Sequence, residues 1–191
     1  MIIIDLMIIM LFIYSIVLLS GLKLMFNSKY VQVITFLLIT YTPLTQLIEG
    51  YKLGYTGIGS IIIFIIVFLL IFIWGYRRNK YIYSIHNVKQ EDVMNIIEEY
   101  LKIKNIKYEA RDEEIYLPEC YKTIYANNLI EKSLNLKEIK DMDFYNELVE
   151  SVRVGVKGIK KRYFPIEGMM YLIFVGIFYW IRTDFLVGFL K

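Results

Sequence analysis

The sequence is poor in residues on which protein chemistry often depends. It contains one cysteine, Cys120, one histidine, His86, and two alanines among 191 residues. One cysteine cannot form an internal disulfide, and one cysteine with one histidine cannot supply the usual zinc ligands. Serine-elbow, phosphate-loop and kinase motifs are also missing. We therefore predict no metal site, no cofactor and no enzymatic activity.

Charge is scarce over much of the chain. The interval from Arg77 to Arg162 holds 17 of the 22 Lys and Arg residues and 15 of the 19 Asp and Glu residues. The flanking sequence is nearly free of charge, and 57% of all residues are hydrophobic. This division predicts a membrane environment for the flanks and water for the middle. The net charge of +3 is small and mixed, which argues against a nucleic-acid partner.

Four apolar segments have the length of membrane-spanning helices, because a hydrocarbon core about 30 Å thick needs about 20 helical residues. The first begins with the acidic Asp5 and is too long for a signal peptide, so we interpret it as an anchor. The third ends with Trp74 and Tyr76, aromatic residues typical of the membrane interface. For the fourth, a shorter helix lying in the interface is the alternative. The segments are residues 2–21, 31–48, 57–76 and about 166–184.

The second apolar segment is more polar than the others, and Pro43 is predicted to interrupt its helix. Two interpretations are open for its hydroxyl and amide side chains. They line a pathway through the membrane, or they form contacts between helices of a bundle. The candidate polar intramembrane face consists of Thr35, Thr42, Thr45 and Gln46.

The distribution of basic residues predicts the orientation, because Lys and Arg near the ends of spans stay in the cytoplasm. Basic residues follow the first segment, follow the third, and precede the fourth. With four spans all of these clusters fall on one side, so we predict a cytoplasmic middle region and both termini outside. The last cluster either serves orientation alone or faces anionic lipid. It comprises Arg153, Lys157, Lys160, Lys161 and Arg162.

The charged middle region has the pattern of a small α+β domain. The sequence predicts strands at 81–88, on either side of the turn at 111–114, at 122–127 and at 133–139, with a helix as the alternative for the last of these. Helical periodicity predicts helices at 90–104 and after Asp141 or Asp143, the second ending near Val154 because Gly155 follows. The order β-α-β-β-(β)-α predicts two helices packed on an antiparallel sheet.

We thus predict an integral membrane protein in the plasma membrane, with about four transmembrane helices. Residues 1–76 form a three-helix region, 77–163 the cytoplasmic domain, and 164–191 the fourth helix with its tail. The predicted function is a membrane-tethered interaction or regulatory domain that binds a protein partner, or a second copy through the helices. A subunit of a small transporter or pore is the alternative. A third possibility is an enzyme in which a Cys120 thiolate pairs with His86.

Overall fold

The computed structural model describes residues 2–111, 114–120, 122–127 and 132–189. Within these ranges the chain is mostly helical, with small antiparallel strands. It divides into two compact units. We call Asn27–Lys80 the hairpin unit, and Met1–Phe26 with Tyr81–Lys191 the sheet unit. Each unit is described by itself.

The hairpin unit consists of α2 (Ser28–Lys52) and α3 (Ile58–Asn79), two antiparallel helices. Asn27 closes its open end, because its Oδ1 accepts from the Lys29 N–H at 3.0 Å and its Nδ2 donates to the Lys80 carbonyl at 2.6 Å. Further along, the rings of Phe36 and Phe72 are 4.7 Å apart. Gly54 turns the chain at the far end with φ of +78°, which a side chain would disfavour.

The expected interruption at Pro43 is wrong, because α2 is one helix from Ser28 to Lys52. Proline removes a single N–H from the helix ladder, and the rest of the ladder continues on both sides. The nearby hydroxyls bond within the helix: Thr40 Oγ1 donates to the Phe36 carbonyl at 2.7 Å, and Thr45 Oγ1 to the Thr42 carbonyl at 2.8 Å.

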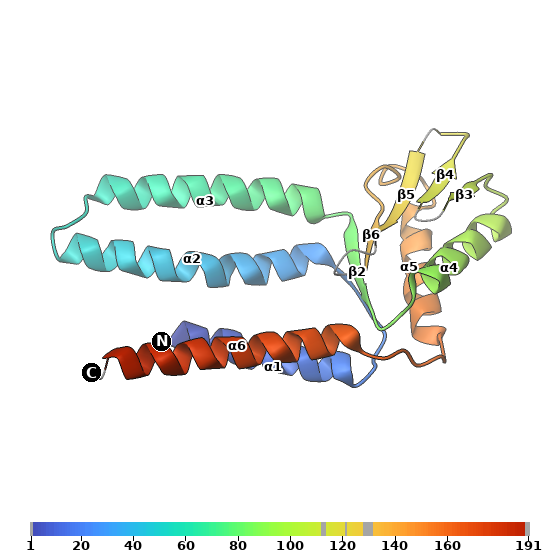
Figure 1. Cartoon of the computed structure of the whole chain (residues 1–191). Coiled ribbons are helices and arrows are strands. Elements are labelled where there is room, and N and C mark those ends of the chain that lie inside the picture. Colours follow the sequence, from blue (N-terminus) through green and yellow to red (C-terminus); the bar gives the residue numbers. More distant parts are fainter. Residues whose placement is uncertain (1, 112–113, 121, 128–131, 190–191) are drawn as a thin grey trace. The chain divides into compact units, whose positions relative to one another are not determined.

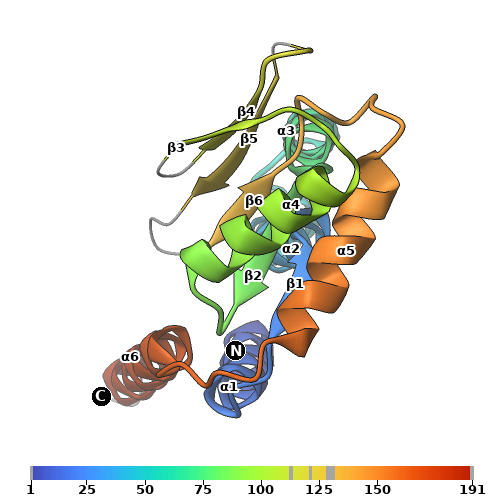
Figure 2. The ribbon, with the colours of Figure 1, turned by 90° about the vertical axis from the view of Figure 1, so that its right-hand side faces the viewer.

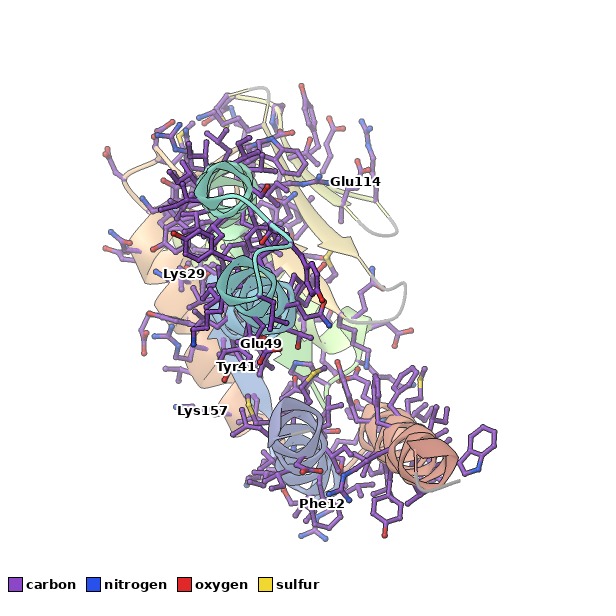
Figure 3. The ribbon with its side chains drawn as sticks, turned by 90° about the vertical axis from the view of Figure 1, so that its left-hand side faces the viewer. Phe12, Lys29, Tyr41, Glu49, Glu114 and Lys157 are labelled. Atoms are coloured by element: carbon purple, nitrogen blue, oxygen red, sulfur yellow. The ribbon has the colours of Figure 1, made fainter. Side chains whose placement is uncertain are left out.

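Among the residues that the structure describes, two helices, α2 and α3, are long and apolar enough, by length and composition, to cross a membrane. No residue of either helix, all of which the structure describes, is buried. Figure 3 shows their side chains extending outward around both helices. The other two predicted spans contain shorter apolar stretches, Asp5–Leu19 and Ile166–Trp180. A membrane location therefore rests on two helices rather than four.

The sheet unit is built on strands in the order β1-β2-β6-β5-β4-β3. The pairs β2–β6, β6–β5, β5–β4 and β4–β3 are antiparallel. The predicted strands of the middle region are all present. One strand was not predicted: β1 follows the first apolar segment and lies next to β2 at the sheet edge. The strands are β1 (Leu24–Asn27), β2 (Ile82–His86), β3 (Glu109–Arg111), β4 (Glu114–Leu117), β5 (Lys122–Asn127) and β6 (Ser133–Asn135).

Helices α4 (Gln90–Ile103) and α5 (Tyr145–Gly158) lie side by side on one face of this sheet, as Figure 2 shows. Their apolar residues recur at helical spacing and meet the apolar residues of the strands, which forms the core. The fully buried core side chains include Ile85, Ile97, Leu101, Ile115, Ile124, Leu134, Leu148, Val152 and Val156.

Two details of α5 differ from expectation. Neither Asp141 nor Asp143 caps it, because the helix begins at Tyr145 after Phe144 and no side chain caps it. It also continues past Val154 to Gly158. A Cβ atom at Gly155 would lie 2.8 Å from Cγ2 of Ile96 on α4, so glycine permits the two helices to approach. Burial of the core face outweighs the helix propensity that glycine loses, about 1 kcal/mol.

Helices α1 (Ile2–Leu19) and α6 (Ile166–Phe189) pack against each other in antiparallel directions, and Figure 1 shows them side by side. The rings of Tyr14 and Tyr171 make an edge contact with centroids 4.9 Å apart. Gly168 lies against the last turn of α1. At the other end of the pair, Arg182 forms an ion pair with Asp5. We call these two helices the α1–α6 pair.

A polar contact between α4 and α5 gives a testable pH dependence. Glu147 forms an ion pair with Lys104 and accepts a hydrogen bond from Tyr100 at 3.3 Å. The Lys104 ammonium, and then the Tyr100 hydroxyl, hold the pKa of the Glu147 carboxyl below its ordinary value. Burial, together with the Glu147 charge, raises the pKa of Tyr100 to about 12.

We expect Glu147→Gln to reduce thermal stability slightly at neutral pH. A lowered carboxyl pKa contributes stability above the ordinary carboxyl range, and this contribution is lost as the pH falls through the folded-state pKa. The difference between the wild type and Glu147→Gln should therefore shrink between pH 6 and pH 3, measured by thermal unfolding in detergent. An unchanged difference over this range would contradict the assignment.

Candidate functional site

The one histidine of the chain lies at the point where the α1–α6 pair meets the sheet. Along β2, Tyr83 and Ile85 face the core under α4 and α5, so the alternation of a strand directs His86 to the opposite face. That face would leave a terminal strand residue open to water. Instead His86 is 1% exposed. Its imidazole is covered by residues of α1, β1 and α6.

Both ring nitrogens of His86 have protein partners. Nδ1 lies 2.6 Å from Oε2 of Glu167 in α6, and Nε2 lies 3.0 Å from the hydroxyl of Tyr14 in α1. A carboxylate only accepts hydrogen bonds, so Nδ1–H of His86 donates to Glu167. In the neutral imidazole Nε2 is then the acceptor, and the Tyr14 hydroxyl donates to it. We call this chain of three side chains the Tyr14–His86–Glu167 relay.

Aromatic and charged neighbours fix the relay in position. The ring of Phe26 in β1 stacks on the imidazole with centroids 5.0 Å apart and an interplanar angle of 23°. The second carboxylate oxygen of Glu167 lies 3.8 Å from Nζ of Lys132. Glu167 also occupies the first turn of α6, where the helix dipole favours negative charge. Lys132, His86 and the helix end thus all face this carboxylate.

The next residue attaches the sheet to α1 independently. Asn87 is buried and adopts the left-handed conformation with φ of +59°. Its Nδ2 donates to the carbonyls of Leu18 at 2.8 Å and Leu22 at 2.9 Å. The last carbonyls of a helix have no partner within the helix, so this amide completes the C-terminal end of α1. On the opposite side of the junction, Lys23 donates to the carbonyl of Ile159.

The relay has the connectivity of a carboxylate, a histidine and a hydroxyl, which in other settings activates a nucleophile. Here the imidazole is 1% exposed, and its nitrogens are occupied by Tyr14 and Glu167. The three side chains join α1, β2 and α6 through one charge-assisted hydrogen bond, between His86 and Glu167, and one neutral bond, between Tyr14 and His86. A shift of either helix would break a bond to the same ring.

The proposed pairing of Cys120 with His86 is not formed. Cys120 lies in the turn after β4, packs against the core and donates weakly to the Leu117 carbonyl at 3.7 Å. In the sheet register, Ile82 of β2 and residue 125 of β5 both pair with Asn135 of β6. His86 is four residues beyond position 82 and position 122 is three residues before position 125, so the two are offset by seven residues along the strands. At about 3.3 Å per residue, Cys120 and His86 are about 20 Å apart along the sheet.

The other candidate residues occupy separate places. Of the polar face predicted in the second apolar segment, Thr35, Thr42 and Gln46 are exposed on α2, and the Thr45 hydroxyl bonds to its own helix. The basic cluster lies on α5 and in the segment that connects α5 to α6, and Figure 3 labels Lys157. Within that cluster, Arg153 binds Glu150 at 2.8 Å.

Sequence reasoning missed the relay. It considered His86 only as a partner for Cys120 and did not connect it with Tyr14 or Glu167. The three are separated by 72 and 81 residues along the chain. The one local signal was an acid at the predicted start of the fourth apolar segment, and nothing in the sequence indicated its partner.

Comparison with family models, with curated protein sequences and with solved structures gives no match for this chain.

Proposed function

We propose that this chain is a multi-pass membrane protein that presents a small cytoplasmic α+β domain as a non-enzymatic interaction or regulatory module. The observation that carries the proposal is the Tyr14–His86–Glu167 relay, because it connects the sheet to two apolar helices at once. A domain that the apolar helices only held at the membrane would need no buried polar contact with them. Such an attachment makes the position of the sheet depend on the position of the helices.

Helix lengths support four spans. At about 1.5 Å per residue, the 18 residues of α1 extend about 27 Å and the 24 residues of α6 about 36 Å, against a hydrocarbon core about 30 Å thick. The Asp5–Arg182 ion pair joins the two helices at the end away from the sheet. A paired charge near a span end is tolerated in a membrane, and Arg can extend toward the surface.

The module is proposed to act by transmitting displacement. Helix α1 continues into β1 after a short turn, and seven residues separate Gly158, the last residue of α5, from the start of α6 at Ile166. Both helices of the α1–α6 pair are therefore joined to the sheet unit by short connections, and the relay fastens them laterally. A protein partner or a second copy that changed the packing of this pair would move β2, and with it the surface formed by α4 and α5.

Cysteine labelling in intact cells tests the proposed topology. In a Cys120→Ser background, Lys52→Cys and Lys107→Cys each introduce one thiol, at the end of α2 and after α4. We expect a membrane-impermeant maleimide to label position 52 in intact cells and position 107 only after permeabilisation. Labelling of position 107 in intact cells would reverse the orientation. Release of the chain from membranes by alkaline washing would remove the proposal altogether.

A further inference from the structure

The last turn of α5 and the segment that connects it to α6 carry four basic side chains within six residues. Lys157, Lys160, Lys161 and Arg162 are all exposed. Among the residues that the structure describes, no carboxylate forms an ion pair with any of these four side chains. Several other basic residues of the same domain do form such ion pairs. Ion pairs with a carboxylate are formed by Lys102, Lys104, Lys107, Arg111, Lys140 and Arg153.

Tyr163 fixes the geometry of this segment against α4. Its hydroxyl donates to Oδ2 of Asp92 in the first turn of α4 at 2.6 Å, and this bond raises the pKa of Tyr163 to about 12. The ammonium of Lys161 lies 5.4 Å from the ring centroid, and that of Lys89 lies 5.7 Å from it. Two cations therefore gather around one anchored ring, at a distance typical of cation–π contacts.

Exposed apolar side chains lie directly beside these charges. Phe164 is 72% exposed and Ile166, the first residue of α6, is 61% exposed. Leu22 is 56% exposed, and its neighbour Lys23 donates to the carbonyl of Ile159 in the same connecting segment. A purely aqueous surface gains nothing from an exposed phenylalanine next to lysines. A membrane interface accommodates both, because aromatic and aliphatic groups enter the headgroup region while basic groups meet phosphate.

We infer that residues 157–166, together with Lys89, form a docking surface for the headgroups of anionic phospholipids. We call it the headgroup surface. The inference rests on the proposed function, since it requires α6 to enter the cytoplasmic leaflet at Ile166. Charge complementarity selects the ligand class: four cations without carboxylate partners face a leaflet whose anionic phosphates attract basic residues. The lipid would hold α5 and the connecting segment close to the start of α6.

The test uses the full chain reconstituted in nanodiscs of phosphatidylcholine alone and of phosphatidylcholine with 30% phosphatidylglycerol. Hydrogen–deuterium exchange is measured on peptides covering residues 157–165. We expect slower exchange in the anionic discs. The variant Lys160→Gln/Lys161→Gln/Arg162→Gln should lose this difference, because each basic residue near an anionic surface strengthens binding by about five-fold.

A matched control removes the same charge from another part of the domain. Lys102→Gln/Lys107→Gln/Arg111→Gln also lowers the net charge by three, at residues that already have carboxylate partners. This variant should keep the lipid-dependent protection. Equal exchange in the two disc types, with the wild-type chain inserted, would overturn the headgroup surface and leave the proposed topology intact. Loss of protection in both triple variants would also overturn it, because net charge alone would then explain the effect.

Discussion

His86→Ala is expected to lower the free energy of unfolding by about 1–3 kcal/mol, the range found when a buried hydrogen-bonding group loses its partner, and the cavity left by the ring adds to this loss. The substitution leaves Glu167 without its 2.6 Å bond and Tyr14 without its acceptor, both in a region shielded from water. The ring stack with Phe26 is lost as well. Chemical unfolding in detergent measures the loss. Hydrogen exchange should also become faster in the second half of α1, because the helix loses one of its two attachments to the sheet and keeps only the one through Asn87.

A combined substitution shows whether the loss of stability in His86→Ala comes from the broken polar contacts or from the packing of the junction. Replacing an entire buried polar group by apolar residues of similar volume is often neutral or stabilising. We therefore expect Tyr14→Phe/His86→Leu/Glu167→Met to regain most of the stability that His86→Ala loses. A loss below about 1 kcal/mol for His86→Ala would show that the relay carries little energy. Failure of the triple variant to recover would show that packing, rather than charge pairing, dominates the junction.

Gly168→Leu is expected to disrupt the α1–α6 pair. A Cβ atom at this position would lie 2.9 Å from the backbone nitrogen of Leu19 and 3.1 Å from Cβ of Leu18. Backbone cannot move aside as the end of a flexible side chain can, so the helices must separate. Overpacking of this kind typically costs about 1–3 kcal/mol. Separation would also pull Glu167, the preceding residue, away from His86, so the loss should exceed that of overpacking alone.

The same helix provides the control for this prediction. Gly176 lies two turns further along α6, and a Cβ atom there would meet nothing within 4 Å. Gly176→Leu should therefore be neutral or slightly stabilising, since leucine has the higher helix propensity. Thermal unfolding of both variants in the same detergent gives the comparison. Equal behaviour of the two leucine variants would mean that the close approach of α1 and α6 at Gly168 is not retained in the protein.

The sequence alone determined the elements whose signal is local. Apolar runs located all four long helices, and the alternation from Tyr81 onward located β2. The helical periodicity of residues 90–104 predicted α4, and Val93, Ile97 and Leu101 on its buried face recur at that spacing. These patterns are readable because hydrophobic burial imposes a period of 3.6 on a helix and 2 on a strand, whatever the partner is. Most of the α+β domain was predictable for this reason.

Where long-range packing competed with local preference, sequence reasoning failed. Gly155 indicated the end of a helix, but contact with Ile96 made glycine the residue that fits there. Pro43 indicated an interruption, but the rest of the helix ladder holds α2 together. Strand β1 carries no alternation long enough to identify, and it exists because β2 offers an edge to pair with. For Gly155 and for β1 the deciding partner lies far away in the chain, whereas for Pro43 it is the neighbouring part of the same helix.

Composition and periodicity determined that this protein has apolar helices and a compact charged domain. The surroundings of each segment constrain the polarity and spacing of its own side chains, so the signal is local. Only the tertiary structure decided that Tyr14, His86 and Glu167 meet. A hydrogen bond of 2.6 Å depends on the positions of two backbones to a fraction of an ångström. No pattern in the residues between positions 86 and 167 encodes that distance; the packing of α1, β2 and α6 sets it.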